Sequence, residues 1–280
     1  MKKKLNRILV VVLLAGILAA GIYVNSLMPI ITGYAAKNLA SAVFVSGREA
    51  GDVEALDLNF SFIRFTTNTV DSAQRSVTSR FLWGESTAVC REGCGVTLLR
   101  GADAGELRRR DMPLPPDTIA DESLPHGDPA VSARLAPIAK AFVDDHAYDG
   151  HPFAFVVLHK GSLVAERYGK GIGPDTRLLS WSMAKSFVNA LAGIMAGDSL
   201  VDIHAPMSIP EWQDDERRAI TLHDLMQMQS GLEWDEDYGA RSDVNVMLHC
   251  EADMGLFALR KPLSHTPAPA GTTPADPPTS

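Results

Sequence analysis

Ser182 and Lys185 are the residues of this chain whose types and spacing best fit nucleophilic chemistry. They lie three positions apart in Leu-Ser-Trp-Ser-Met-Ala-Lys-Ser-Phe (179–187), where the pattern predicts the start of a helix. Residues i and i+3 share one face of a helix, so the lysine amine can reach the serine hydroxyl. A serine hydroxyl is a poor nucleophile until a base takes its proton, and a desolvated lysine with a lowered pKa can be that base. The spacing therefore predicts a serine nucleophile with a lysine activator.

Chance is the rival interpretation, because a chain of this length should contain about one S-x-x-K by accident. The sequence holds a single such motif, and its context favours function. Phe187, Leu191 and Ile194 continue an apolar helical pattern that Gly197 can end. The serine is thus expected at the N-terminal end of a buried helix, where backbone N–H groups and the helix dipole favour an oxyanion.

The overall charge argues against nucleic acid as a partner. The chain of 280 residues has a formal net charge of -8, although Lys2, Lys3, Lys4 and Arg7 are clustered at its start. Without these four, 22 basic residues stand against 34 acidic ones. Such a body repels phosphate backbones, so we expect no binding of nucleic acid.

The N-terminus predicts a membrane anchor. Ile8 to Val24 is uncharged and almost wholly apolar, close to the ~20 residues with which a helix crosses a bilayer. A cleaved signal peptide is the alternative, with Ala40-Ser41-Ala42 as the cleavage motif, and a buried core helix fits poorly with the lysine cluster. We therefore expect residues 1–34 to form a cytoplasmic tip and a signal-anchor helix in the cell (inner) membrane, with the body on the extracytoplasmic, periplasmic side.

The region 35–124 is weakly patterned, with possible strands at 57–65 and 79–83. Its Cys90 and Cys94, separated by three residues, can form a disulfide, half of a zinc site or two unrelated thiols. Zinc needs two further ligands, and no second ligand pair of suitable spacing occurs, so we expect a Cys90–Cys94 disulfide with Cys250 unpaired and no metal. Residues 111–129 are rich in proline and acidic residues and predict a linker.

The following part of the chain has clear local patterns. Residues 130–146 show helical spacing, and two apolar runs within 153–168 flank a Lys-Gly turn, which predicts a β-hairpin. Farther on, Thr221 can cap a short helix that ends at Ser230-Gly231.

Together these features resemble the β-lactamase-related serine hydrolases: class C β-lactamases, penicillin-binding proteins, esterases, D-aminopeptidases and 6-aminohexanoate-dimer hydrolases. The resemblance rests on the hairpin, the Ser182-x-x-Lys185 helix, Asp-Ser-Leu-Val-Asp (198–202) with Pro-Glu-Trp (210–212), and Ile-Thr-Leu-His-Asp-Leu-Met-Gln-Met-Gln-Ser-Gly-Leu (220–232). It covers residues 130–263. It implies an α+β fold in which an antiparallel sheet is combined with helices.

The resemblance also implies roles for residues. Ser182 would form the acyl-enzyme with Lys185 as its activator, on a small-molecule amide or ester and without a cofactor, and Tyr238 could line the substrate cleft. The family's later tyrosine motif and its K-T-G or H-x-G strand are absent, and Asp276 stands where the tyrosine belongs. The proline-rich stretch 264–280 is interpreted as an aberrant tail after a partial hydrolase domain at 125–263.

Three functions remain open on the sequence. The first is a membrane-anchored serine hydrolase, impaired in this chain. The second is a catalytically inactive relative that binds a ligand or partner at the membrane surface. The third is an independent interaction module at residues 35–124, where the resemblance does not reach.

Overall fold

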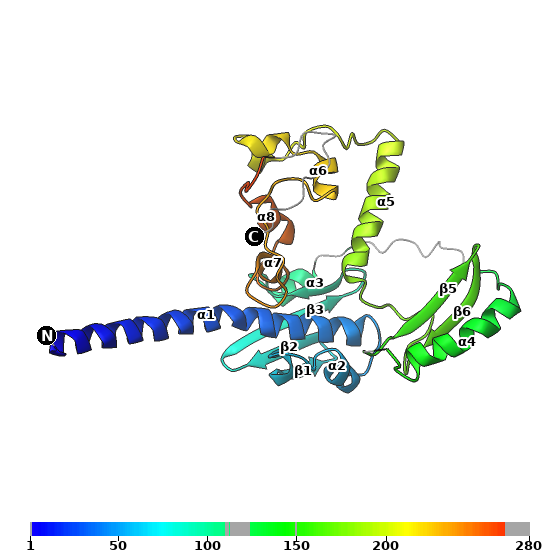
Figure 1. Ribbon diagram of the computed structural model, residues 1–280, viewed down its shortest axis with the longest axis horizontal. Helices are drawn as coiled ribbons and strands as arrows, with labels where there is room; N and C mark the ends of the chain where they lie inside the picture. The colour runs from blue at the N-terminus through cyan, green and yellow to red at the C-terminus, as the bar shows by residue number, and fades with distance from the viewer. Residues whose placement is uncertain (1, 110–111, 113–123, 149, 267–280) are drawn as a thin grey trace. The chain divides into compact units, whose positions relative to one another are not determined.

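The structure is a computed structural model, and it describes residues 2–109, 112, 124–148 and 150–266 (Figure 1). It is mixed α and β, and the chain divides into two compact units. The first unit comprises residues 1–30 and 180–280, and the second comprises residues 31–179. The division at residue 179 falls inside the hydrolase domain predicted for 125–263. The predicted tail lies almost entirely outside the described residues.

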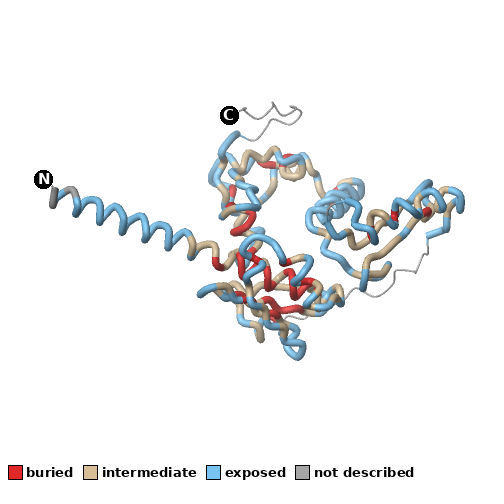
Figure 2. The backbone as a smooth tube through the Cα atoms, turned by 60° about the horizontal axis from the view of Figure 1, so that its bottom comes forward, coloured by how far each residue is buried: buried red, intermediate tan, exposed pale blue. Residues whose placement is uncertain are grey.

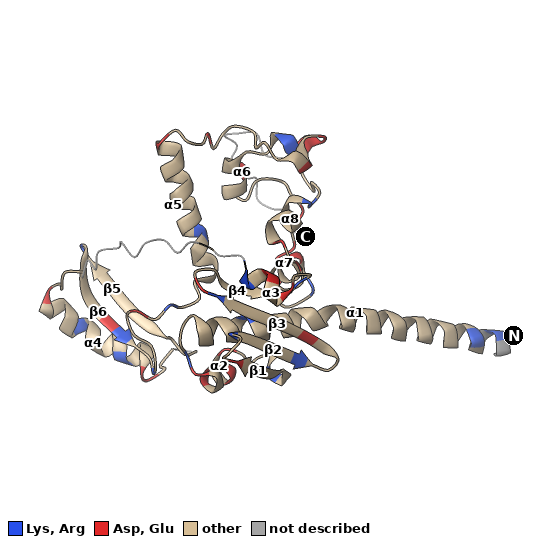
Figure 3. Ribbon diagram, turned by 180° about the vertical axis from the view of Figure 1, so that it is seen from behind, with Lys and Arg blue, Asp and Glu red and all other residues tan. Residues whose placement is uncertain are grey.

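One helix, α1 (Lys2–Phe44), runs through the N-terminal region. It carries no charged residue between Arg7 and Lys37, and Figure 3 shows basic residues in blue near its start, followed by a long uncharged stretch. Its apolar residues from Ile8 to Tyr23 are exposed, whereas Ala35, Leu39 and their neighbours are buried (Figure 2). By length and composition α1 can cross a membrane, a test that a signal sequence also passes.

The buried half of α1 packs on a four-stranded antiparallel sheet in the order β1-β2-β3-β4. The strands are β1 (Thr67–Asp71), β2 (Ser76–Phe81), β3 (Gly84–Arg91) and β4 (Gly95–Leu98). Val77 and Ala88 pair across β2 and β3 and are fully buried on one face of the sheet, while Val89 is buried on the other face. Two polar contacts tie the sheet to the helix: Thr32 and Ser86 share a buried hydroxyl hydrogen bond of 2.7 Å, and Arg75 donates to the carbonyl oxygen of Phe44.

The segment 57–65 is not the strand that its partial alternation predicted. After α2 (Ala50–Leu56) the chain turns and forms a 3₁₀ helix, η1 (Ile63–Phe65). A strand would place Leu58 and Phe62 on one face, but Leu58 is buried with Ile63 while Phe62 is exposed. A bidentate ion pair between Arg48 and Asp57 holds the start of this turn. The predicted strand at 79–83 is in part correct, because β2 ends at Phe81.

The second unit also contains a helix that packs against a two-stranded β-hairpin. Helix α4 (Pro129–Val143) packs against β5 (Ala154–His159) and β6 (Ser162–Tyr168), which pair antiparallel as the sequence predicted. The 35–124 region is not separate from this part. The Arg48 guanidinium lies 4.3 Å from the ring centroid of Phe153, and residues 31–179 cluster as one unit. A short helix, α3 (Ala104–Arg108), follows β4.

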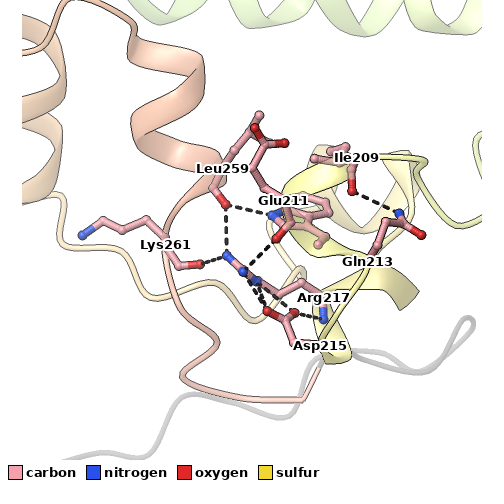
Figure 4. A network of polar contacts seen from close by, with 8 residues as sticks. Ile209, Glu211, Gln213, Asp215, Arg217, Leu259 and Lys261 are labelled. Atoms are coloured by element: carbon pink, nitrogen blue, oxygen red, sulfur yellow. Dashed lines mark hydrogen bonds and ion pairs between the residues drawn. The ribbon is translucent and has the colours of Figure 1, made fainter.

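The first unit is built mainly from short helices. In chain order they are η2 (Trp181–Met183), α5 (Ala184–Gly197), η3 (Pro210–Trp212), η4 (Glu216–Ala219), α6 (Leu222–Met226), α7 (Asp243–His249) and α8 (Met254–Leu259). Arg217 joins two of its segments: it is paired with Asp215 and donates to the carbonyl oxygens of Leu259 and Lys261 (Figure 4). Trp212, which is fully buried, donates from Nε1 to the same Leu259 carbonyl at 2.8 Å.

Candidate active site

The structure brings the two predicted chemical residues together. Ser182 lies in η2 and Lys185 is the second residue of α5, which directly follows η2. Lys185 Nζ donates to Ser182 Oγ over 3.1 Å. The amine and the hydroxyl are therefore close enough for direct proton transfer.

The residue before the serine has an unusual backbone conformation. Trp181 has a φ of 44°, in the left-handed region that side chains other than glycine seldom adopt. Such a conformation costs about 1–3 kcal/mol and is often found where a functional residue is presented by a tight turn. It allows the chain to enter α5 with Ser182 in the turn ahead of the helix.

The expectation of a buried nucleophile helix was wrong for this structure. Helix α5 begins near Ser182 and ends at Gly197 as predicted, but within it only Ala192 is buried. The large apolar residues along it are exposed: Phe187, Val188, Leu191, Ile194 and Met195. Apolar periodicity identifies which residues prefer to be covered, but it does not say which segment covers them.

Tyr238 does not join the Ser182–Lys185 pair. Its side chain is exposed, and its hydroxyl donates to Glu236 Oε1 at 2.8 Å. This hydrogen bond to an anionic carboxylate raises the pKa of Tyr238 above its ordinary value. Among the described residues no polar contact links Tyr238 with Ser182 or Lys185, so a role for it in substrate binding stays a prediction.

A residue that the sequence did not single out holds the Tyr238 loop. Asn245, on α7, is buried, and its Nδ2 donates to the carbonyl oxygens of Asp237, Tyr238 and Ala240 over 2.7–3.3 Å. A buried side-chain amide that bonds three carbonyls of one loop fixes the path of that loop. No side-chain pattern in the sequence indicates this role, because all three partners are backbone carbonyls.

We expect Asn245→Ala to loosen this loop. The substitution leaves three loop carbonyls without their donor, at a cost of about 1–3 kcal/mol. Faster hydrogen exchange in peptides covering 235–241 would measure it, and Asn245→Asp, which keeps the shape but removes the amide donor, should act similarly. Gln227→Ala, at an exposed position in the same unit, is the control. Unchanged exchange in Asn245→Ala would contradict the assigned role.

The helix after Thr221 is capped as predicted. Thr221 Oγ1 accepts from the backbone N–H of Asp224 at 3.0 Å, while Asp224 Oδ2 accepts from the backbone N–H of Thr221 at 2.9 Å. This reciprocal pair is a capping box, and it accounts for the burial of Asp224. In the described fold, Asp224 therefore has a structural role as part of the cap of α6.

The predicted Cys90–Cys94 disulfide is not formed, and Cys90, Cys94 and Cys250 are not joined to one another by disulfides. The strand register explains this, because Cys90 pairs across the β3–β4 ladder with Val96 while Cys94 lies in the turn. Cys90 is buried and Cys94 only partly so. Within the described residues, no group of three or more His, Cys, Asp or Glu side chains is arranged to hold a metal ion.

Comparison with known proteins supports the assignment made from these residues. The Beta-lactamase family model matches residues 137–270. A 6-aminohexanoate-dimer hydrolase from Paenarthrobacter ureafaciens is 29% identical over 87 residues, which cover 30% of this chain and 22% of that enzyme. The aligned stretch is thus about a fifth of the relative's length. No solved structure matches the chain.

Proposed function

Since residues 137–270 place this chain in the β-lactamase-related serine hydrolase family, we propose that it attacks an amide or ester with Ser182 and forms a covalent acyl-enzyme. The observation that carries the proposal is the 3.1 Å hydrogen bond between Lys185 Nζ and Ser182 Oγ. Labelling of the full-length protein at Ser182 by a fluorophosphonate tests it.

The proton balance sets the roles of the two residues. A lysine ammonium that donates to Ser182 cannot take its proton, so the reactive form has a neutral Lys185 amine. As the bond from Oγ to the carbonyl carbon forms, the hydroxyl proton passes to that amine. The bond to the leaving group then breaks, and the leaving amine or alcohol receives the proton. Water releases the acid and restores Ser182.

The proposed substrates are small-molecule amides or esters, and no step above needs a cofactor. The amide class is favoured by the relative, which is named as a dimer hydrolase of 6-aminohexanoate. Which amide or ester is cleaved depends on the groups that line the substrate site. Tyr238 is the residue we propose for that lining.

A second candidate function is ligand binding, or acylation without rapid turnover. It is favoured by the absence, among the described residues, of a third polar side chain in contact with the Ser182–Lys185 pair. Steady-state catalysis usually needs a group that delivers a proton to the leaving group and donors that stabilise the oxyanion. A stoichiometric burst of product without later turnover would favour this candidate over steady hydrolysis.

We further propose that α1 anchors the protein in the cell membrane. Support comes from the uncharged, exposed stretch after Arg7, with basic Lys4 and Arg7 on its N-terminal side. The alternative of signal cleavage at Ala40-Ser41-Ala42 is disfavoured, because this motif lies far beyond the end of the apolar run Ile8–Val24.

This anchoring makes a topological prediction. Protease added to intact spheroplasts should degrade the body of the protein from about residue 35 onward, because basic residues stay on the cytoplasmic side. A cytoplasmic marker protein must survive the same treatment. A body that is fully protected would contradict the orientation, and a soluble product lacking about the first 42 residues would indicate a cleaved signal.

A further inference from the structure

Strand β5 is an edge strand with the composition of a strand that is paired on both sides. It pairs with β6, and among the described residues no third strand or isolated bridge pairs with its other edge. Its sequence, Ala-Phe-Val-Val-Leu-His (154–159), contains no Asp, Glu, Lys, Arg or Pro. A near-continuous apolar run of this kind is typical of strands inside a sheet. The outer edge of β5 is therefore suited to a further strand.

The other strand edges of the second unit carry the usual protection against pairing with another chain. Strand β1 is largely polar and ends in Asp71, and β4 has only four residues. The outer edge of β6 is covered at its start: the backbone N–H of Gly127 donates to the carbonyl oxygen of Leu163 at 2.8 Å, and the N–H of Leu163 donates to that of Pro125 at 2.9 Å. Charges, short length and covering segments are the common ways to protect an edge. Among the described residues, β5 shows none of these on its outer edge.

The hydrogen-bond pattern of the hairpin fixes which backbone groups of β5 face outward. The backbone N–H of Gly169 donates to the carbonyl oxygen of Phe153 at 2.9 Å, so the backbone of Phe153 is directed at the β6 side. In an antiparallel ladder this direction alternates from one residue to the next. The N–H and C=O groups of Ala154, Val156 and Leu158 therefore point away from β6, and Val156 is the middle one of the three.

The side chains of β5 alternate between two faces of the hairpin. The ring centroid of Phe155 lies 5.6 Å from that of Phe142 in α4, so Phe155 faces the helix. Val156 and Leu158 face the other side and are 51% and 54% exposed. The register irregularity after Val157 adds its extra residue to β6, so the alternation along β5 continues. Helix α4 packs mainly on β6, which makes the outer edge of β5 the less covered side of the hairpin.

We propose that β5 pairs antiparallel with β5 of a second copy of this chain. A two-fold axis perpendicular to the sheet at Val156 places Val156 opposite its own counterpart and Ala154 opposite Leu158 of the second copy. Each of these residues directs its outward backbone groups at the other strand, and each side chain meets an apolar side chain on the same face. No like charges come together, because β5 has no charged residue. The two hairpins then form one sheet in the order β6-β5-β5-β6, which has a usual number of strands.

A second copy fits this edge better than the tail of the same chain. Residues 264–280 are rich in proline, which has no N–H to donate to a ladder. A copy of β5 supplies outward donors and acceptors at the same spacing, over the same length and without charge. The pairing involves neither Ser182 nor Lys185, so it is independent of the proposed hydrolysis.

Val156→Pro tests the pairing in the full-length protein. Proline removes the N–H of Val156, which points outward, and leaves the hydrogen bonds between β5 and β6 in place; edge strands accept proline at such positions. We expect sedimentation velocity in detergent to find a dimer for the wild type. Association of the variant should be at least about 30-fold weaker, because both hydrogen bonds at the axis are lost.

A pair of charge variants separates loss of pairing from loss of folding. Val156→Lys and Val156→Glu each place like charges opposite one another at the axis, so each alone should associate weakly. An equal mixture of the two should recover a dimer that contains one copy of each variant, which misfolded chains could not do. A mixture no more dimeric than its components refutes the pairing, as does a monomeric wild type or a Val156→Pro variant that associates like the wild type. A monomeric wild type whose Ala154 and Val156 amides resist hydrogen exchange would assign the edge to another segment of the same chain.

Discussion

Ser182→Ala should abolish covalent labelling of the full-length protein by a fluorophosphonate. In the wild type, a bond forms between Ser182 Oγ and phosphorus, fluoride leaves, and the hydroxyl proton passes to the Lys185 amine 3.1 Å away. Alanine offers no oxygen to attack. We expect intact-mass analysis to find a single adduct on the wild type and a rate of labelling at least about 10³-fold lower in the variant.

The lysine should matter nearly as much, because the two residues act as one unit. Lys185→Ala and Lys185→Gln both remove the proton acceptor, and both should slow labelling of Ser182 by a comparable factor. Ser186→Ala is the matched control, since Ser186 is an exposed serine on the same helix. Equal labelling of wild type and Ser182→Ala would remove Ser182 from the mechanism. Normal labelling of Lys185→Ala would refute the role of the lysine.

What the sequence predicted correctly was determined by short-range chemistry. The hairpin β5–β6, the extent of α4 and the end of α5 at Gly197 follow from apolar periodicity and turn residues. The cap at Thr221 follows from a threonine three residues before an aspartate. The Ser182–Lys185 hydrogen bond follows from i, i+3 geometry at a helix start.

What the sequence missed depends on long-range pairing. The disulfide expectation failed because the register of β3 and β4 places Val96 opposite Cys90, and three-residue spacing carries no information about register. The segment 57–65 alternates in part like a strand, but its path is set by an ion pair with Arg48, outside the segment. Asn245 went unnoticed because its three partners are backbone carbonyls, which no side-chain pattern reveals.

The largest stability effect should come from Trp212. This side chain is fully buried, and its Nε1 donates to the carbonyl oxygen of Leu259, the acceptor that it shares with Arg217. Trp212→Ala removes the buried ring and the donor together, which should cost about 3–5 kcal/mol. Because that approaches the whole stability of a small unit, we expect residues 203–263 to lose most of their protection from hydrogen exchange.

The two causes of this loss can be separated. Trp212→Phe keeps most of the buried apolar surface and removes only the donor, so it should cost about 1–2 kcal/mol. Arg217 still donates to the Leu259 carbonyl in that variant, which keeps the cost near the lower value. The sheet β1–β4 belongs to the other unit and should keep its exchange protection in both variants. Equal losses in Trp212→Phe and Trp212→Ala would assign the effect to the hydrogen bond instead of the buried ring, and unchanged protection in Trp212→Ala would contradict the packing described for this unit.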